Sequence, residues 1–367
     1  MNEKSDLLKK IAQPLLEWYD KGHRILPWRE NRDAYRIWVS EIMLQQTRVE
    51  AVIPYYHRFL EEFPNVEALA GADDDRLLKC WEGLGYYSRV RNMKKAAITV
   101  MEEYDGRMPD TWEALQKLSG IGSYTAGAIA SIAYNRPVPA VDGNVLRILS
   151  RLRMDEAFIN LSAVKKRVED ELLGVMPINR PGDFNQALME LGATVCIPNG
   201  KPKCEECPWN TLCLARQNGR IEEFPYKEAK KKRTVEKKTV LILKEGNKIA
   251  IHKRPSKGLL AGLYEFPMLE GHLEESEVIF QLKEMGLFSV RIERLPEAVH
   301  IFSHKEWHMI GYAVRVDELE KRMDEEIKDF KFVEIEETQE KYPIPSAFTA
   351  YAGYMRLKLG NERFLVD

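Results

Sequence analysis

Apolar residues recur at helical spacing along the first two-thirds of the chain, from Leu7 to about Leu214. One example is the group Ile37, Trp38, Ile42 and Val49. A repeat near 3.6 residues is typical of helices that bury one face. We therefore predict that this part of the chain is all-α.

The pattern changes after a basic segment at residues 215–238, which contains four basic residues in succession at 230–233. Such a segment is typical of a linker. Beyond it, Thr239–Leu243 and Lys248–His252 are strand-like runs on either side of Glu245–Asn247, the pattern of a β-hairpin. A separate α+β domain is therefore expected at residues 239–367. Its other expected elements are a helix over Glu274–Met285, a strand over His308–Val316 and a closing helix near Ala347–Leu357.

Composition fits a globular protein of two or three domains, because 367 residues with 44% hydrophobic and 31% charged content exceed one usual core. No apolar run is long enough for a membrane span, and the N-terminal stretch lacks a signal-peptide core. We therefore expect a cytoplasmic protein that does not contact membranes. The net charge of -2 gives no overall attraction to nucleic acid. Any DNA-binding surface must come from local clusters of charge.

Four of the five cysteines are spaced Cys-x7-Cys-x2-Cys-x5-Cys, at Cys196, Cys204, Cys207 and Cys213. Cys80 lies apart, in a segment with helical spacing. Four thiolates this close can surround a metal site, and the asymmetry argues against a disulfide framework. The spacing by itself leaves zinc and an iron-sulfur cluster open.

A tight turn with two glycines, Gly120 and Gly122, separates a helix expected to end near Leu118 from one expected to start near Ser123. Such a turn exposes backbone N-H groups at a helix N-terminus, where a phosphate oxygen can bind. The same G-x-G pattern also occurs in ordinary helix-helix turns.

Two carboxylates have unusual sequence contexts. Asp142 directly precedes an apolar-periodic helix, where the helix dipole favours its ionised form, although an aspartate here can simply be an N-cap. Glu41 lies on a largely apolar helix face, where loss of hydration raises a carboxyl pKa. Its alternative role is a buried ion pair with Arg36 or Arg48.

The glycine turn and the cysteines together resemble the helix-hairpin-helix DNA glycosylases that carry a cluster, in the endonuclease III and MutY branches. The resemblance covers roughly residues 7–213. In the lyase branch, the position of Tyr124 holds a lysine that attacks the sugar as an amine. A phenol cannot form that imine, so water becomes the nucleophile. Tyr124 therefore indicates the monofunctional, MutY-like branch.

This resemblance implies a six-helix barrel at about 29–135, a cluster domain from 1–28 with 136–214, and a [4Fe-4S] cluster on the four cysteines. It implies that adenine opposite 8-oxoguanine or guanine is removed from double-stranded DNA. Glu41 would protonate adenine N7, and Asp142 would stabilise the oxocarbenium-like sugar. Asn144 would help to position Asp142, and Tyr124 would share the pocket.

The resemblance also assigns residues to DNA and base recognition. Gln46 and Tyr86 match positions that intrude beside the base opposite adenine, whereas aromatic pairs such as Tyr86 and Tyr87 are otherwise commonly core residues. The other assigned residues of the helical region are Arg24, Leu26, Trp28, Arg29, Thr47, Leu84, Gly120 and Gly122.

The C-terminal domain resembles the NUDIX-like lesion-recognition domain of MutY proteins, in which Phe302, Ser303 and His304 match the loop that senses 8-oxoguanine. Met285 and Gly286 stand where a working NUDIX box needs Arg-Glu, so pyrophosphatase activity is not expected. We expect a monomer. The alternatives are a bifunctional glycosylase and lyase for oxidised pyrimidines, or a lesion-binding protein without catalysis.

Overall fold

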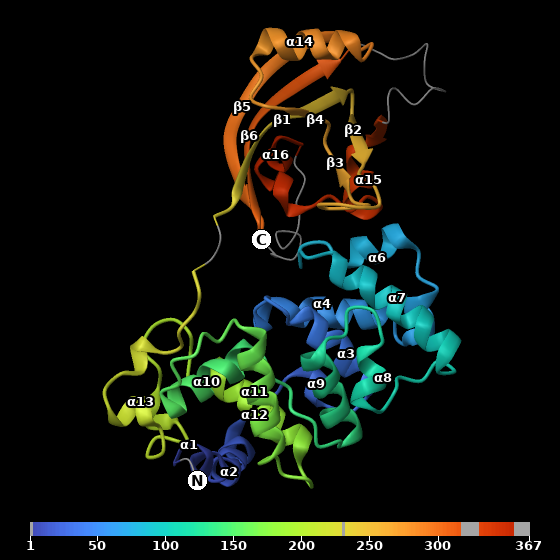
Figure 1. The fold of residues 1–367 in the computed structure, drawn as a ribbon. Coiled ribbons are helices and arrows are strands. Elements are labelled where there is room, and N and C mark those ends of the chain that lie inside the picture. The colour runs from blue at the N-terminus through green and yellow to red at the C-terminus, as the bar shows by residue number, and fades with distance from the viewer. Residues whose placement is uncertain (1–2, 230–231, 317–329, 356–367) are drawn as a thin grey trace. The chain divides into compact units, whose positions relative to one another are not determined.

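A computed structural model describes residues 3–229, 232–316 and 330–355, and the chain divides into two compact units (Figure 1). The first unit comprises Met1–Gly71 and Asn92–Ala229. The second comprises Ala72–Arg91 and Lys230–Asp367. A short segment from the helical region thus belongs to the same unit as the C-terminal region.

The described residues of the first unit form helices and no strand, which confirms the all-α prediction. Helix α7, Ser88–Glu103, begins in the second unit and continues into the first. The other elements of the first unit are α1 Glu3–Leu8, α2 Ala12–Gly22, η1 Pro27–Arg29, α3 Ala34–Met43, α4 Val49–Glu62, α5 Val66–Ala70, α8 Trp112–Gln116, α9 Ser123–Tyr134, α10 Gly143–Arg153, α11 Ser162–Leu173, α12 Pro181–Thr194, η2 Cys204–Glu206, α13 Leu214–Gln217 and η3 Ile221–Glu223.

Side-chain caps fix where several of these helices begin. Asp33, Asn65 and Thr111 accept hydrogen bonds from the first turns of α3, α5 and α8. Asp142 does the same for α10. Each such cap stabilises a helix by about 1 kcal/mol, because it satisfies N-H groups that have no partner within the helix.

One core cluster of the first unit joins α2, α10 and α12 to the cysteine segment. Trp209, between two of the cysteines, is buried in this cluster and donates its indole N-H to the Ile11 carbonyl at 3.1 Å. The N-terminal helices are thereby packed against the cysteine region. The buried members on the three helices include Leu15, Tyr19, Val145, Ile148, Leu149, Leu152, Phe184, Leu188 and Leu191.

Helix α9 is buried along nearly its whole length and approaches the chain after it very closely. A Cβ atom added at Gly127 would lie 2.3 Å from the Pro139 carbonyl oxygen. This approach holds α9, and with it the residues at its N-terminus, against the core.

The second unit contains a seven-stranded mixed sheet with the main order β3-β2-β1-β6-β5, in which β4 pairs with β1 and β7 with β2. β1 and β6 are parallel, and the other pairs are antiparallel. The strands are β1 Thr234–Glu245, β2 Lys248–Lys253, β3 Tyr264–Glu265, β4 Met268–Glu270, β5 Ser289–Ile301, β6 Lys305–Val316 and β7 Phe330–Glu334. The helical elements are α6 Asp74–Cys80, α14 Glu275–Glu284, α15 Ile335–Glu340, η4 Ser346–Phe348, α16 Thr349–Ala352 and η5 Gly353–Met355.

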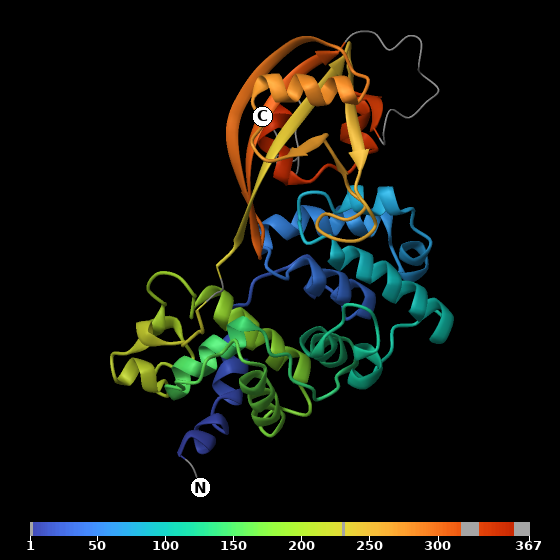
Figure 2. The ribbon, with the colours of Figure 1, turned by 45° about the horizontal axis from the view of Figure 1, so that its top comes forward.

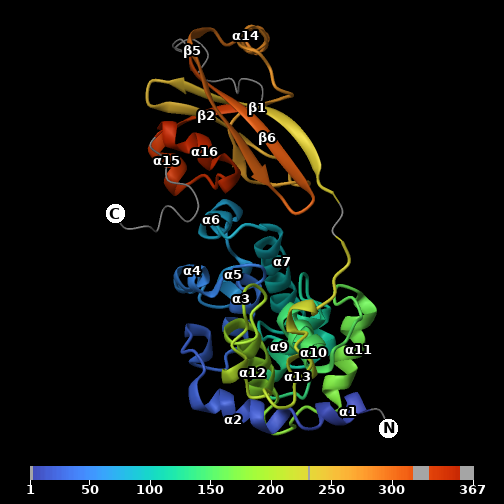
Figure 3. The same ribbon diagram turned by 90° about the vertical axis from the view of Figure 1, so that its left-hand side faces the viewer.

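Both faces of this sheet are covered (Figure 3). Val240 and Ile242 face α16, whereas their neighbours Leu241 and Leu243 face α14, which lies over the other face (Figure 2). A strand buried on both faces needs a continuous apolar run, because successive side chains point to opposite sides.

The β-hairpin and the helix after it agree with the sequence prediction, whereas several boundaries differ from it, among them the start of β6 at Lys305 rather than at His308. β1 begins at Thr234, inside the predicted linker, because its polar first residues pair with β6 from Thr234 and Lys305 onward. The expected closing helix is three short helical elements between Ser346 and Met355, and its last residues, 356–357, lie outside the described residues.

Within the described ranges, no helix is long and apolar enough to cross a membrane.

Gly127→Ala is expected to lower the free energy of unfolding by about 1–3 kcal/mol, because the new methyl group would collide with backbone that cannot move independently of the core. Urea unfolding followed by circular dichroism measures this. Gly22→Ala is the matched control, since no atom lies within 4 Å of its added Cβ. Equal stability of the two variants would contradict the close packing of α9.

Candidate active site and cysteine cluster

A cleft of about 930 Å³ in the first unit is lined by the segment before α3, by α3 and its following turn, and by α9, α10 and α12. It brings together eleven of the residues selected from the sequence. These are Arg24, Leu26, Trp28, Arg29, Glu41, Gln46, Thr47, Gly122, Tyr124, Asp142 and Asn144. Gly120 lies just outside its lining, and Leu84, Tyr86 and Phe302–His304 belong to the second unit.

Glu41 is buried, at 6% exposure, on the inner face of α3. Its Oε2 accepts a hydrogen bond of 2.5 Å from the Tyr124 hydroxyl, on α9. Burial raises the pKa of Glu41 to about 7; the hydrogen bond from Tyr124 opposes this shift, and the charge of Asp142 adds to it. The partner of Glu41 is thus a phenol, and the alternative of an ion pair with Arg36 or Arg48 is not what the structure contains.

Tyr124 is a hydrogen-bond donor at the centre of the cleft. Burial, together with the nearby carboxylates, raises its pKa well above the ordinary value of 10.0. The phenol therefore stays protonated at physiological pH. Its hydroxyl also lies 3.3 Å from Sδ of Met189, a weaker acceptor on α12. When Glu41 is protonated, its O-H can donate a hydrogen bond to the Tyr124 oxygen, and the Tyr124 hydroxyl hydrogen can then point toward Sδ of Met189.

Asp142 occupies the N-cap of α10, as its sequence context suggested. Its Oδ1 accepts from the backbone N-H groups of Asn144 at 2.9 Å and Val145 at 2.8 Å, and Oδ2 accepts from Nδ2 of Asn144 at 2.7 Å. The N-H groups at the N-cap favour the ionised form, as the sequence indicated. Burial raises the pKa of Asp142, and the three hydrogen bonds only partly oppose it.

Asn144 connects Asp142 to the cysteine segment through one arginine. Arg147 donates from Nη2 to Oδ1 of Asn144 at 2.9 Å and to the Gly192 carbonyl at 2.7 Å, and from Nε to the Cys196 carbonyl at 3.0 Å. Gly192 allows this approach, since an added Cβ would lie 2.6 Å from that of Asn144. The position of Asp142 is therefore tied to that of Cys196.

Glu190 is a residue of the cleft that sequence reasoning missed. At 2% exposure it accepts from Nε of Arg24 at 2.7 Å and from Nη2 of Arg29 at 2.8 Å. Burial raises its pKa, but the hydrogen bonds and charges of the two arginines outweigh this and bring it to about 2. One buried carboxylate thus holds two of the arginines that line the cleft, Arg24 and Arg29. Its only sequence signal was an acid within an apolar helix, Ala-Leu-Met-Glu-Leu-Gly-Ala, the context that drew attention to Glu41.

Two turns at the rim of the cleft have left-handed backbone. Helix α3 ends at Met43, and Gln46 follows with φ 60°, a conformation that is uncommon outside glycine. In the glycine turn, Gly120 has φ 77°, and Gly122 caps α9. Lys165 donates to the Ser123 hydroxyl there at 2.8 Å and adds a positive charge to this edge.

The second unit presents two of the predicted recognition sites. Tyr86 has φ 46° and is 46% exposed, whereas Tyr87 is buried, so the core-packing alternative holds only for Tyr87. Phe302 and Lys305 form the tight turn between β5 and β6, with a backbone hydrogen bond of 2.8 Å. Phe302 packs against Trp307, and Ser303 and His304 are exposed at the tip.

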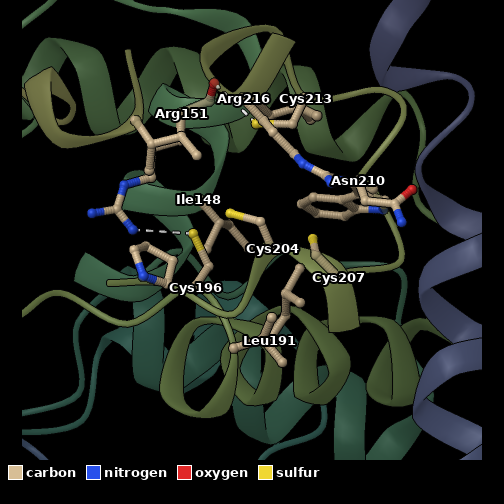
Figure 4. A pocket seen from close by; sticks show the side chains of 14 residues that line it. Ile148, Arg151, Leu191, Cys196, Cys204, Cys207, Asn210, Cys213 and Arg216 are labelled. Carbon is tan, nitrogen blue, oxygen red and sulfur yellow. Dashed lines mark hydrogen bonds between the residues drawn. The ribbon is translucent and has the colours of Figure 1, made fainter. Parts of the chain in front are cut away.

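The four clustered cysteines line one cavity in the first unit (Figure 4). Arg151 donates to Sγ of Cys196 at 3.3 Å and to the Ile197 carbonyl at 3.0 Å. Burial raises the pKa of the Cys207 thiol to about 12. Cys80 is far from this arrangement in sequence and lies buried in the second unit.

The four thiols of this cavity are the donor set available for a metal centre. Across the residues that the structure describes, no three Cys, His, Asp or Glu side chains are arranged to hold one ion. A mononuclear zinc site needs four sulfurs about 2.3 Å from one metal. The four thiols instead surround a shared space walled by apolar groups such as Ile148, Leu191 and Trp209.

Residues 39–172 match the model of the HhH-GPD superfamily of base excision DNA repair proteins, and residues 239–352 match that of the NUDIX domain. The chain is 38% identical to the adenine DNA glycosylase of Mus musculus, with 83% of this chain and 70% of that protein aligned. It is 35% identical to the adenine DNA glycosylase of Buchnera aphidicola from Acyrthosiphon pisum, with 83% and 87% aligned. A thermostable thymine-DNA glycosylase superposes with a TM-score of 0.53 at 27% identity, over 59% of this chain and 100% of that one.

The pKa of Glu41 predicts a stability that depends on pH. Between 4.5, its ordinary value, and about 7, the folded protein keeps a proton that the unfolded chain releases, so its stability falls as pH rises through this window. Glu41→Gln removes the cost of burying a charged carboxylate at high pH. Relative to wild type, the variant is expected to gain about 2–3 kcal/mol in unfolding free energy between pH 5 and pH 8.

Urea titrations at both pH values measure this gain. Glu102→Gln changes an exposed glutamate of α7 and serves as the control. An equal pH dependence in wild type and Glu41→Gln would show that Glu41 is not held protonated by burial.

Proposed function

The chain belongs to the adenine DNA glycosylases, and from this membership we propose that the cleft between Glu41 and Asp142 is where adenine is cut from its sugar. The enzyme is a monofunctional DNA N-glycosylase of base excision repair. The observation that carries the assignment of the site is Glu41, a buried carboxyl with a pKa of about 7 that shares the cleft with a second carboxyl.

Glu41 supplies the acid. Breaking an N-glycosidic bond requires a proton on the departing base, and a group with a pKa near 7 is both protonated and able to donate at neutral pH. We assign its proton to N7 of adenine. The Tyr124 hydroxyl holds the carboxyl in place at 2.5 Å and stabilises the anion left after transfer.

Asp142 supplies the anion. As the bond breaks, positive charge develops on the deoxyribose, and a carboxylate near it lowers the barrier. Asp142 is held by three hydrogen bonds from Asn144 and Val145, so it does not need to reorient during the reaction. Water then adds to the sugar, with the Glu41 carboxylate as the base that accepts its proton.

Strand cleavage by an amine is not part of this mechanism. Tyr124 stands at the position where the lyase branch carries its lysine, and a phenol cannot form an imine. Lys165 also lines the cleft, but its ammonium is bound to the Ser123 hydroxyl at the glycine turn. We assign this lysine to the DNA backbone.

The substrate that we propose is double-stranded DNA with adenine opposite 8-oxoguanine or guanine. A mispaired base costs least to flip out of the helix. Gln46 and Tyr86, both exposed with left-handed backbone, suit the space beside the opposite base, and the Phe302–His304 turn suits its recognition. We place this activity with a monomer on chromosomal DNA in the cytoplasm.

We further propose that Cys196, Cys204, Cys207 and Cys213 hold a [4Fe-4S] cluster. The membership of the adenine DNA glycosylases and the apolar cavity that all four thiols line support this choice. The cluster would cross-link residues 196–213 through its four iron-sulfur bonds. Arg147 and Arg151 then hold α10 against this segment, while the base is cut at Glu41 and Asp142.

Asp142→Asn is expected to slow adenine release about 100-fold or more, since it removes the charge that stabilises the developing cation. Single-turnover assays on duplexes with adenine opposite 8-oxoguanine and opposite guanine measure the rate and the preference between them. Asp110→Asn, an exposed aspartate that pairs with Arg136, should react like wild type. An unchanged rate in Asp142→Asn would leave a lesion-binding role, and abundant borohydride-trapped adducts would indicate a lyase.

Anaerobic purification is expected to give a brown protein with about four irons per chain. Iron analysis and visible absorption test this. Replacing Cys207 by serine should lower the iron content, whereas Cys80→Ser should leave it unchanged. A colourless protein that contains one zinc ion would contradict the cluster.

A further inference from the structure

The segment Ala72–Arg91 contains the turn that carries Tyr86, and it contacts the C-terminal region. It belongs to the same compact unit as residues 230–367. Asp75, in the first turn of α6, pairs with Lys253 at 2.6 Å and accepts from the Tyr264 hydroxyl at 2.9 Å. Arg91, at the other end of the segment, donates to the Ala261 carbonyl. Both ends of the segment are therefore fixed to the C-terminal region.

A buried ion pair lies between these two ends. Nζ of Lys79 lies 2.7 Å from Oε2 of Glu82 and donates to the carbonyls of Thr338 at 2.8 Å and Tyr342 at 3.0 Å. Oε1 of Glu82 accepts from the backbone N-H of Ile344 at 3.2 Å. Glu82 is 1% exposed, so these contacts are made out of water, where they are geometrically specific. The pair thus forms hydrogen bonds with backbone groups of residues 338–344.

The turn that presents Tyr86 follows Glu82 without an intervening element. Gly83, Gly85 and Tyr86 have φ values of 101°, 67° and 46°. Glycine adopts positive φ values readily, whereas a residue with a side chain rarely does. Trp81 donates to the Gly85 carbonyl at 3.1 Å, and Arg89 donates to the same carbonyl at 3.1 Å. These two hydrogen bonds hold the residue before Tyr86 to side chains on both sides of the turn, and Glu82 directly precedes the turn.

We propose that Lys79 and Glu82 are positioning residues that fix the Tyr86 turn to the C-terminal region, so that both act on the base opposite adenine as one body. The proposal rests on the proposed function for its substrate. An ion pair that only strengthened α6 would need no contact with residues 338–344. The contacts to three backbone groups of that segment tie the turn directly to the C-terminal region.

A double-mutant cycle tests the coupling. The four full-length holoproteins are wild type, Tyr86→Ala, Lys79→Met with Glu82→Gln, and the triple variant. Changing both members of the pair avoids leaving one buried charge without its partner. Single-turnover rates of adenine release are measured on a duplex with adenine opposite 8-oxoguanine.

Tyr86→Ala and the Lys79→Met, Glu82→Gln variant are each expected to slow release by about tenfold, the order of one lost aromatic contact with a base. The triple variant should be no slower than the slower of the two, because both changes remove the same action of Tyr86. Reductions that multiply in the triple variant, or a wild-type rate in the Lys79→Met, Glu82→Gln variant, would overturn the proposal.

Two controls separate positioning from loss of structure and from failure of the proposed function. Lys283→Met changes an exposed lysine of α14 in the same unit and should keep the wild-type rate. Asp75→Asn removes the partly exposed pair with Lys253 at the other end of the segment without leaving a buried charge unpaired, and repeating the cycle with it covers a paired variant that does not fold. Absence of adenine release by wild type would count against the proposed function, whereas an active wild type with independent effects would count only against the coupling.

Discussion

The burial of the Glu41 carboxyl between α3 and α9 is the constraint on which the catalytic site depends. An acid on the inner face of a helix is costly when charged, and this cost is what raises its pKa to about 7. Tyr124 lowers the cost of this burial, because its hydroxyl forms a hydrogen bond with the carboxyl group. The raised pKa of Tyr124 keeps the phenol itself protonated. The close packing of α9 at Gly127 keeps that hydroxyl in place. The raised pKa of Glu41 therefore lowers the stability of the fold at neutral pH and also makes Glu41 an effective acid at that pH.

Helix α10 connects the other half of the chemistry to the cysteines. Its N-cap is Asp142, and its arginines at 147 and 151 reach the Cys196 carbonyl, the Cys196 sulfur and the Ile197 carbonyl. Glu190 on the neighbouring α12 holds Arg24 and Arg29 in the same way. Two buried carboxyl groups of the cleft, Glu41 and Glu190, thus have partners from distant parts of the sequence, whereas Asp142 is held by its neighbours in α10. Its side chains are held in place before a substrate arrives, which favours catalysis by fixed electrostatics.

The helices, the β-hairpin and the grouping of four cysteines could be predicted, because each depends on residues that are near one another in the sequence. Helical periodicity, the Glu245–Asn247 turn and the cap at Asp142 are local signals, and the structure agrees with them. The beginning of β1 could not be predicted, since polar residues from Thr234 become a strand only through pairing with β6. The sequence likewise could not show that Tyr86 is exposed and Tyr87 is buried, because a left-handed turn decides which ring is buried.

By itself, the sequence determined which chemical groups this protein has: two carboxylates in special contexts, a tyrosine in place of an amine, and four thiols. Tertiary structure alone decided what these groups do to each other. It placed Tyr124 on Glu41, buried Asp142 enough that its pKa is raised despite the hydrogen bonds at the N-cap, and added Glu190 to the pocket. The reason is physical: a pKa depends on hydration and on charges a few ångströms away, and these are set by residues that meet only when the chain is folded.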